Sequence, residues 1–284
     1  MSRLILLFPI LLILLNPVTV FAQSPQVLTS IRPLQLITRH IMQGVGEPDV
    51  LIDGSQSPHH FQLRPSQLKQ IAAADLLIWV SDDFETGISR LKDIAAKPEG
   101  RLALIPEMAT DRLIGDEHDI DGHIWLSPQN VIDISRIISQ RLSQIDPAHQ
   151  SRYQDNTAKL IQKLANWQQQ AGLYFREHQP RYLLDHQFLA YFERDFQLQA
   201  IGSLRNRHDH GSSIRQLKNL YQTLDASGAK CLLTPSLPLS AQARQLADRY
   251  QLQPVLIDIL DQQGQLKHID ELLQRIFAAL QDCV

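Results

Sequence analysis

The chain has 284 residues, with 27 Lys and Arg against 30 Asp and Glu, and a formal net charge of −3. It contains no run of basic residues, which argues against nucleic acid as a partner. This length suffices for one large domain or two medium ones, each with its own core.

The first residues are typical of a secretory signal peptide. Arg3 is followed by an almost unbroken apolar run at 4–15, and Val-Phe-Ala at 20–22 offers a cleavage site. We therefore expect residues 1–22 to be removed and the mature protein to lie in the periplasm. The alternative is an uncleaved membrane anchor, for which the apolar run is short. No later stretch is apolar enough to cross a bilayer, so we expect no membrane span after cleavage.

Short β-rich runs alternate with helical stretches in the first half of the chain. Strands are expected at 27–31, 50–52, 76–80 and 102–105, and helices at 34–42, 65–73, 84–96 and 128–145. Such alternation predicts a parallel sheet with helices on its faces. We assign residues 23–145 to an N-terminal α/β lobe.

The middle of the chain, 146–179, breaks this alternation. Between Pro147 and Pro180 there is no proline and a single glycine, Gly172. Mostly apolar residues recur there at four- and three-residue steps, namely Tyr153, Thr157, Leu160, Leu164, Trp167, Ala171 and Tyr174. This spacing places them on one stripe of a long helix, roughly 45 Å in length. We expect a helix that links two lobes; a surface coiled coil is the alternative.

The alternation then resumes over 180–284. Strands are expected at 182–184, 198–201, 231–233 and 255–257, and helices at 188–196, 213–224, 240–250 and 269–280. Ser212 or Ser213 is a suitable N-cap for the helix expected at 213–224. The fold class is therefore α/β, with two lobes, each a mainly parallel sheet flanked by helices, joined by one long helix.

The chain has two cysteines, Cys231 and Cys283. In an exported protein such a pair is most simply a disulfide. It would tie a predicted strand to the last turn of the final helix, and a loop of that length contributes roughly 3–4 kcal/mol in the chain-entropy model. The alternative, a pair of thiolate metal ligands, lacks the spacing of a zinc site.

Three of the 11 histidines lie at or just after the ends of predicted strands. They are His59, His123 and His186, and ligands of open α/β sheets bind outside the carboxyl ends of the strands. Three imidazoles suit zinc and leave a fourth tetrahedral position, for which Asp258 or a water is the candidate. Three histidines with an open position also describe a catalytic zinc, but no His-Glu-x-x-His motif supplies a general base.

The sequence resembles the zinc-binding proteins of periplasmic ABC importers, the metal-binding substrate-binding proteins of cluster A-I. The motifs are Ser-Pro-His-His-Phe-Gln-Leu-Arg-Pro-Ser (57–66), Ala-Ala-Asp-Leu-Leu-Ile-Trp-Val (73–80), His-Ile-Trp-Leu-Ser-Pro (123–128), and His186 followed by Tyr-Phe-Glu (191–193). The resemblance implies a rigid linking helix, a zinc ion as cargo, no enzymatic activity and a monomer. It also implies delivery to a membrane permease with its ATPase subunit, since this chain has no phosphate-binding loop.

The resemblance also bears on the choice of metal. Manganese and iron relatives usually carry a glutamate where this chain has His186, and the cysteine pair resembles a disulfide of the zinc branch. We therefore expect zinc, with a manganese or iron carrier of the same fold, or a periplasmic zinc chaperone or buffer, as alternatives. The ligands expected from the resemblance are His59, His123 and His186, with Asp258 or water as the fourth.

Several positions depart from the family pattern. His60 stands where the family has aspartate, and Asp258 lacks the proline and glycine of the family's Asp-Pro-Leu-Gly. The family's Ala-Glu-Pro-Gln is Thr-Pro-Ser-Leu at 234–237, and a short segment, 115–121, replaces the long histidine-rich loop. The additional cluster Arg-His-Asp-His-Gly (207–211) is either an auxiliary zinc site built on His208 and His210, with His118 or nearby carboxylates and with His60 as a further candidate, or a polar loop.

Overall fold

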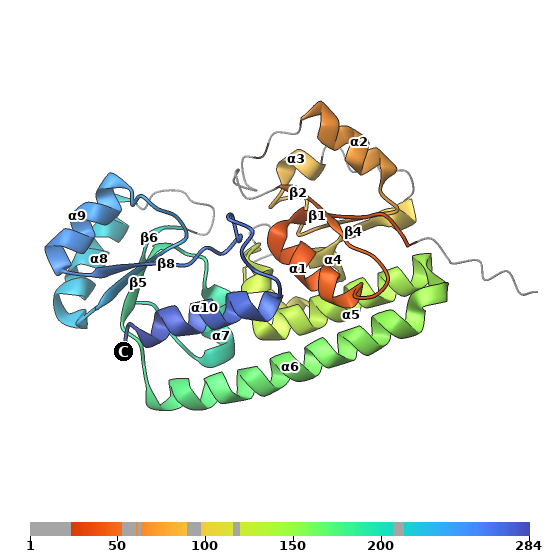
Figure 1. Cartoon of the computed structure of the whole chain (residues 1–284). Coiled ribbons are helices and arrows are strands. Elements are labelled where there is room, and N and C mark those ends of the chain that lie inside the picture. Colours follow the sequence, from red (N-terminus) through yellow and green to blue (C-terminus); the bar gives the residue numbers. More distant parts are fainter. Residues whose placement is uncertain (1–23, 53–60, 62–63, 90–97, 116–119, 207–212) are drawn as a thin grey trace, which may run out of the picture.

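The computed structural model describes residues 24–52, 61, 64–89, 98–115, 120–206 and 213–284 (Figure 1). The first of its two sheets is parallel and four-stranded, in the order β2-β1-β3-β4. The strands are β1 Val27–Ile31, β2 Asp49–Ile52, β3 Leu76–Trp79 and β4 Arg101–Ala103. β1 and β3 are fully buried, which explains their unbroken apolar or small-residue sequences. The predicted parallel N-terminal sheet is confirmed.

Helices cover this first sheet (Figure 1). They are α1 Arg32–Ile41, α2 Pro65–Ala73, α3 Thr86–Ser89, α4 Leu104–Glu107 and α5 Pro128–Ile145. α5 has the predicted bounds because Pro128 opens its first turn and the Ser127 side chain accepts a hydrogen bond from the Asn130 amide. The strand predicted at 102–105 is too long, because β4 ends at Ala103 and the chain continues as the short helix α4. Pro106 in α4 has no backbone N–H to donate to a neighbouring strand, which disfavours a longer strand.

The long predicted helix is α6, Gln150–Glu177, with 28 residues and a length of about 42 Å. It packs along α5 and also contacts α1 and α7 (Ala190–Phe196) (Figure 1). Its stripe from Tyr153 to Phe175 is buried in the main core, so the surface coiled coil is excluded. Asn156 on this stripe donates to the carbonyls of Ile41 and Gln43, both at 2.9 Å, and so satisfies the end of α1.

The second sheet is also parallel and four-stranded, in the order β6-β5-β7-β8. Its strands are β5 Tyr182–His186, β6 Ser203–Arg205, β7 Cys231–Thr234 and β8 Gln253–Leu256. The predicted strand at 198–201 is wrong. The amides of Leu198 and Ala200 donate to the backbone and side chain of Glu193 on α7, so they are not available to a neighbouring strand.

The other helices of this half are α8 Ile214–Ser227, α9 Ala241–Tyr250 and α10 Ile269–Gln281. Ser213 caps α8 together with Gln216, as the sequence predicts, whereas Ser212 lies outside the described residues. One face of the sheet packs on α7 and α10 in the main core, and the other forms a smaller core with α8 and α9. Within the described chain, no helix combines the length and apolarity that a bilayer span requires.

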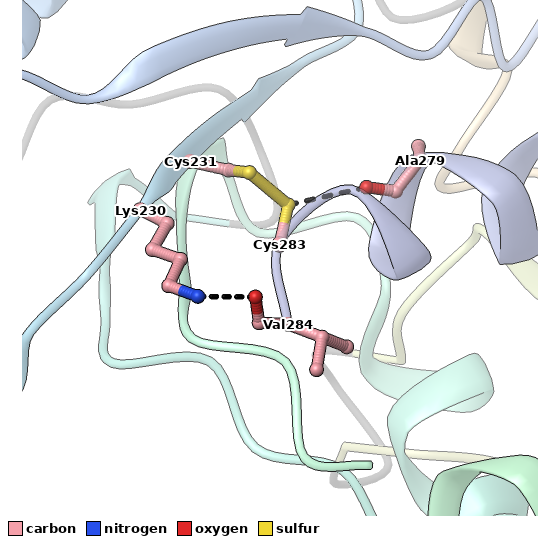
Figure 2. Close-up of a disulfide and its surroundings, with 5 residues drawn as sticks. All are labelled: Lys230, Cys231, Ala279, Cys283 and Val284. Carbon is pink, nitrogen blue, oxygen red and sulfur yellow. Dashed lines mark hydrogen bonds between the residues drawn. A yellow bond between two sulfur atoms is a disulfide. The ribbon is translucent and has the colours of Figure 1, made fainter.

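The predicted disulfide is present between Cys231 at the start of β7 and Cys283 after α10, with a Cα–Cα distance of 5.5 Å (Figure 2). The ammonium of Lys230 donates to the carbonyl of Val284 beside it (Figure 2). The amide of Arg181 donates to the carbonyl of Cys283 at 2.9 Å. The chain end is thus fixed to β5 and β7, the two central strands of the second sheet.

Candidate metal centre

His123 is held rigidly in the loop before α5. Its backbone amide donates to Oδ1 of Asp121 at 3.0 Å, and its Nδ1 lies 2.7 Å from the same oxygen. A carboxylate at Nδ1 fixes the imidazole tautomer with Nε2 as the nitrogen that can bind a metal, and it raises the basicity of that nitrogen. Both side chains are buried, with 3% and 1% exposed. The pair has the arrangement of a metal-binding histidine and its supporting carboxylate.

His186 comes from the other lobe and meets His123. It is the last residue of β5, and its ring centroid lies 5.1 Å from that of His123, with the planes at 67°. Asp185, just before it, accepts from Arg205 at 2.6 Å and from the hydroxyl of Thr234 at 3.1 Å. These bonds tie the ends of the three neighbouring strands together beneath the histidine. The carboxyl edge of the second sheet therefore presents an imidazole to the first lobe.

Aromatic side chains enclose His123. The rings of Phe84 and Trp125 have their centroids 5.7 Å and 5.5 Å from that of His123, and both residues are buried. A side chain at Gly122 would place its Cβ 2.0 Å from the Phe84 ring, so the glycine is what allows this packing. An apolar enclosure of this kind strengthens electrostatic interactions with a bound cation.

A buried carboxyl group lies beside this aromatic wall. Oε2 of Glu85 accepts from the amides of Val80 and Ser81 at the end of β3, at 2.6 Å and 3.2 Å. Burial raises the pKa of Glu85 to about 7. Glu85 thus joins the end of β3 to the start of α3, next to Phe84.

Asp258 follows β8 and presents an unsatisfied oxygen. Its Oδ2 accepts from the amide of Gln262 at 2.8 Å, whereas its buried Oδ1 has no hydrogen-bond partner among the described residues. The neighbouring carbonyl of Ile259 accepts from Trp125 Nε1 at 3.0 Å, which connects this segment to the wall around His123. A buried oxygen without a partner suits a metal ligand.

The other predicted ligands lie outside the described residues. These are His59 in the centre itself and His60, His118, His208 and His210 in the auxiliary site. Of the predicted set, the structure therefore brings together His123 and His186, and it does not group Asp258 with them. Within the described ranges, no group of three or more His, Cys, Asp or Glu side chains is arranged to hold a metal ion.

Sequence reasoning missed the groups that support the two histidines. Asp121, Asp185 and Phe84 were not singled out, although an aspartate stands two residues before His123 and one residue before His186. That proximity is a usable signal, because histidine ligands commonly donate their second ring nitrogen to a carboxylate or carbonyl.

Comparison with known proteins gives the family. The model described as "Zinc-uptake complex component A periplasmic" matches residues 27–283. The high-affinity zinc uptake system protein ZnuA of Yersinia pestis is 28% identical over 219 residues, which cover 67% of this chain and 68% of that protein. The protein of the same name from Haemophilus ducreyi is 27% identical over 236 residues, covering 74% and 76%.

Solved structures share the fold. A crystal structure of ZnuA superposes with a TM-score of 0.76 at 23% identity, covering 90% of this chain and 99% of the other. AdcAII of Streptococcus pneumoniae gives a TM-score of 0.80 at 19% identity, covering 92% and 99%. The predicted fold, with two parallel sheets flanked by helices and one long helix, is confirmed.

The family model spans residues 27–283, and the curated relatives agree with it. Members of this family are non-enzymatic, periplasmic components that pair with an ABC transporter for zinc. The chain belongs to the ZnuA family of zinc-uptake components and is a metal-binding solute-binding protein.

Proposed function

We propose that this protein captures a zinc ion in the periplasm and delivers it to the membrane permease of an ABC importer, whose ATPase subunit supplies the energy. The observation that carries the proposal is the pairing of His123 and His186, one from each lobe, with ring centroids 5.1 Å apart. Two buried imidazoles from opposite lobes suit an ion that is enclosed between them and released when it is handed on.

The proposed ligands are His59, His123, His186 and Asp258, with a water as the alternative fourth ligand. Asp121 supports His123, and the free Oδ1 of Asp258 supports an oxygen ligand at the fourth position. Export through cleavage of residues 1–22 accompanies this proposal, as does a monomeric state in the periplasm. The auxiliary site at His208 and His210 stays a prediction.

Zinc is proposed over manganese because of the donor set. Imidazole is a borderline ligand that suits zinc, whereas manganese favours sites rich in carboxylate oxygen. A centre with three histidines and at most one carboxylate is therefore matched to zinc. The curated relatives named above are zinc uptake proteins, which agrees with this choice.

A metal competition tests the proposal. The protein, stripped of metal, is equilibrated with equimolar Zn²⁺ and Mn²⁺ and separated from free ions, and the bound metals are quantified by plasma mass spectrometry. We expect one zinc per chain and almost no manganese. A preference for manganese at equimolar zinc would contradict the proposal and indicate a manganese carrier on the same fold.

A further inference from the structure

The segment that carries Asp258 belongs to the second lobe but is held by the first. It runs from the end of β8 to α10 and lies against α1 (Figure 1). Trp125 Nε1 donates to the carbonyl of Ile259 at 3.0 Å. Arg32 at the start of α1 donates from Nε to Oδ2 of Asp261 at 3.1 Å and from Nη2 to the carbonyl of Leu266 at 3.2 Å. Both donors lie in the N-terminal lobe.

Both sides of this contact are fixed in place. The other end of the Arg32 guanidinium donates to Gln35 at 2.6 Å, and Gln35 in turn donates to the carbonyl of Pro48 at 2.7 Å. Asp261 is buried, and its Oδ1 accepts from the amides of Gln265 and Leu266 at 2.9 Å and 3.1 Å. The ion pair is therefore charge-assisted, with the Asp261 side chain fully buried and 17% of the Arg32 side chain exposed, and further hydrogen bonds hold both partners in place.

Asp258 and Asp261 belong to one turn. The amide of Asp261 donates to the carbonyl of Asp258 at 3.3 Å, and the amide of Gln262 donates to Oδ2 of Asp258 at 2.8 Å. Asp261 has a left-handed backbone, with a φ of 49°. In the family motif Asp-Pro-Leu-Gly this place is taken by glycine, which adopts that conformation without cost. This chain has an aspartate there instead, and its side chain forms the ion pair with Arg32.

We propose that Arg32 is a positioning residue for the metal centre: through Asp261 it fixes the turn that carries Asp258, next to Trp125 and hence to the aromatic wall around His123. The inference rests on the proposed function, in which Asp258 is the fourth ligand. Without Arg32, the segment loses its bonds at Asp261 and Leu266 and keeps the bond from Trp125 to Ile259, so the carboxylate of Asp258 loses its fixed direction. The second lobe thus offers a ligand whose position is set by the first.

A double-mutant cycle tests this inference. Zinc dissociation constants are measured by chelator competition for the wild type, Arg32→Gln, Asp258→Ala and the double variant. We expect Arg32→Gln to weaken zinc binding about 10-fold, as the loss of an outer-shell partner commonly does. The double variant is expected to bind no more weakly than Asp258→Ala, because Arg32 acts through that carboxylate. Zinc-edge X-ray absorption should show one oxygen donor fewer or displaced in Arg32→Gln.

Two further variants serve as controls. Arg39→Gln changes another arginine of α1, one that pairs with Glu47, and should leave zinc binding unchanged. Asp261→Asn keeps an acceptor for the turn amides and tolerates the left-handed backbone, but removes the charge that pairs with Arg32. It should reproduce the Arg32→Gln effect, with thermal melts verifying that each variant is folded.

The possible failures are distinguishable. If Asp258→Ala leaves zinc affinity and coordination unchanged, the fourth-ligand assignment fails and this inference falls with it. Suppose instead that Asp258→Ala weakens zinc binding. If Arg32→Gln then leaves zinc affinity unchanged, or lowers it equally in the wild type and in the Asp258→Ala background, only the positioning role is overturned. The latter pattern would describe Arg32 as a general contact between the lobes.

Discussion

At the scale of single residues, the proposed metal centre depends on groups that fix the direction of its candidate ligands. Asp121 binds both the backbone amide and the ring of His123, so one carboxylate sets the position and the tautomer of the imidazole. The same carboxylate partly offsets the charge of a cation bound at Nε2. His186 is fixed differently, by its place at the end of a central strand and by the Asp185 contacts beneath it.

Changing Asp121 to asparagine should therefore weaken zinc binding while leaving the fold intact. The amide oxygen can still accept from His123, but the negative charge is lost. We expect the dissociation constant for zinc to rise about 10- to 100-fold, measured by chelator competition. Asp133→Asn, which changes a carboxylate paired with Arg112 and Arg136 on the outer side of α5, is the matched control. Equal affinities for both variants would contradict a supporting role for Asp121.

His123 and His186 each lie in a recognisable motif, and the structure places their rings close together, while their role as ligands stays a prediction. The sequence predicts their support poorly. Asp121 and Asp185 are ordinary acidic residues in a chain with 30 Asp and Glu, and only the folded geometry shows which of them reach an imidazole. Asp261 is a similar case, because its partner Arg32 lies 229 residues away in sequence.

At the scale of elements, the end of β3 and the start of α3 are joined by a buried carboxyl group. Glu85 is 1% exposed and accepts from two backbone amides of the turn. Burial raises its pKa to about 7 from 4.5, so the folded protein retains a proton there that the unfolded chain releases. Between these two pKa values folding takes up a proton, and the free energy of unfolding falls as the pH rises.

The variant Glu85→Gln should remove this pH dependence, because its amide mimics the protonated acid. We expect wild type and variant to be similar in stability near pH 4.5, and the variant to gain up to about 3 kcal/mol on the wild type by pH 7 and above. Thermal or urea unfolding of the metal-free proteins across this range measures the difference. A difference that is constant with pH would contradict the raised pKa.

Elements were predicted best where the local sequence determines the structure. α5 has a capping serine followed by proline at its start, β3 is a continuous apolar run, and the buried β1 is a short run of apolar and small hydroxyl residues. The error at 198–201 arises where a tertiary contact prevails. The Leu-Gln-Ala-Ile sequence is typical of a strand, but the buried Glu193 binds its backbone and moves β6 to Ser203–Arg205.

At the scale of the whole molecule, one core runs through both lobes. Side chains from both sheets, from α5, α6 and α10 belong to the same buried cluster, and only the outer face of the second sheet has a separate core. Hydrogen bonds also connect the two lobes. The hydroxyl of Tyr191 on α7 donates to the carbonyl of Asp121 at 2.6 Å, and Arg194 donates to Oδ1 of Asn130 at 3.1 Å. The lobes are thus firmly attached beneath the paired rings of His123 and His186.

At this largest scale, the sequence predicts the two halves and the long helix but not how the halves pack on each other. The alternation of strands and helices gives two α/β halves, and the proline-free stretch gives α6. The division into 23–145, 146–179 and 180–284 stays a prediction, because periodicity shows which face of an element is apolar but not which neighbour covers it. The meeting of His123 and His186 likewise depends on the packing of the two halves.

The most direct test of a zinc centre between the lobes is zinc stoichiometry and affinity on metal-free protein, measured for the wild type beside His59→Ala, His123→Ala and His186→Ala. His178→Ala, a histidine stacked on Tyr174 at the end of α6, is the control. We predict one tightly bound zinc per chain, greatly weakened by each of the three changes and unaffected by the control. Tight binding that survives all three changes would contradict the account and move the site elsewhere, with His208 and His210 the next residues to test.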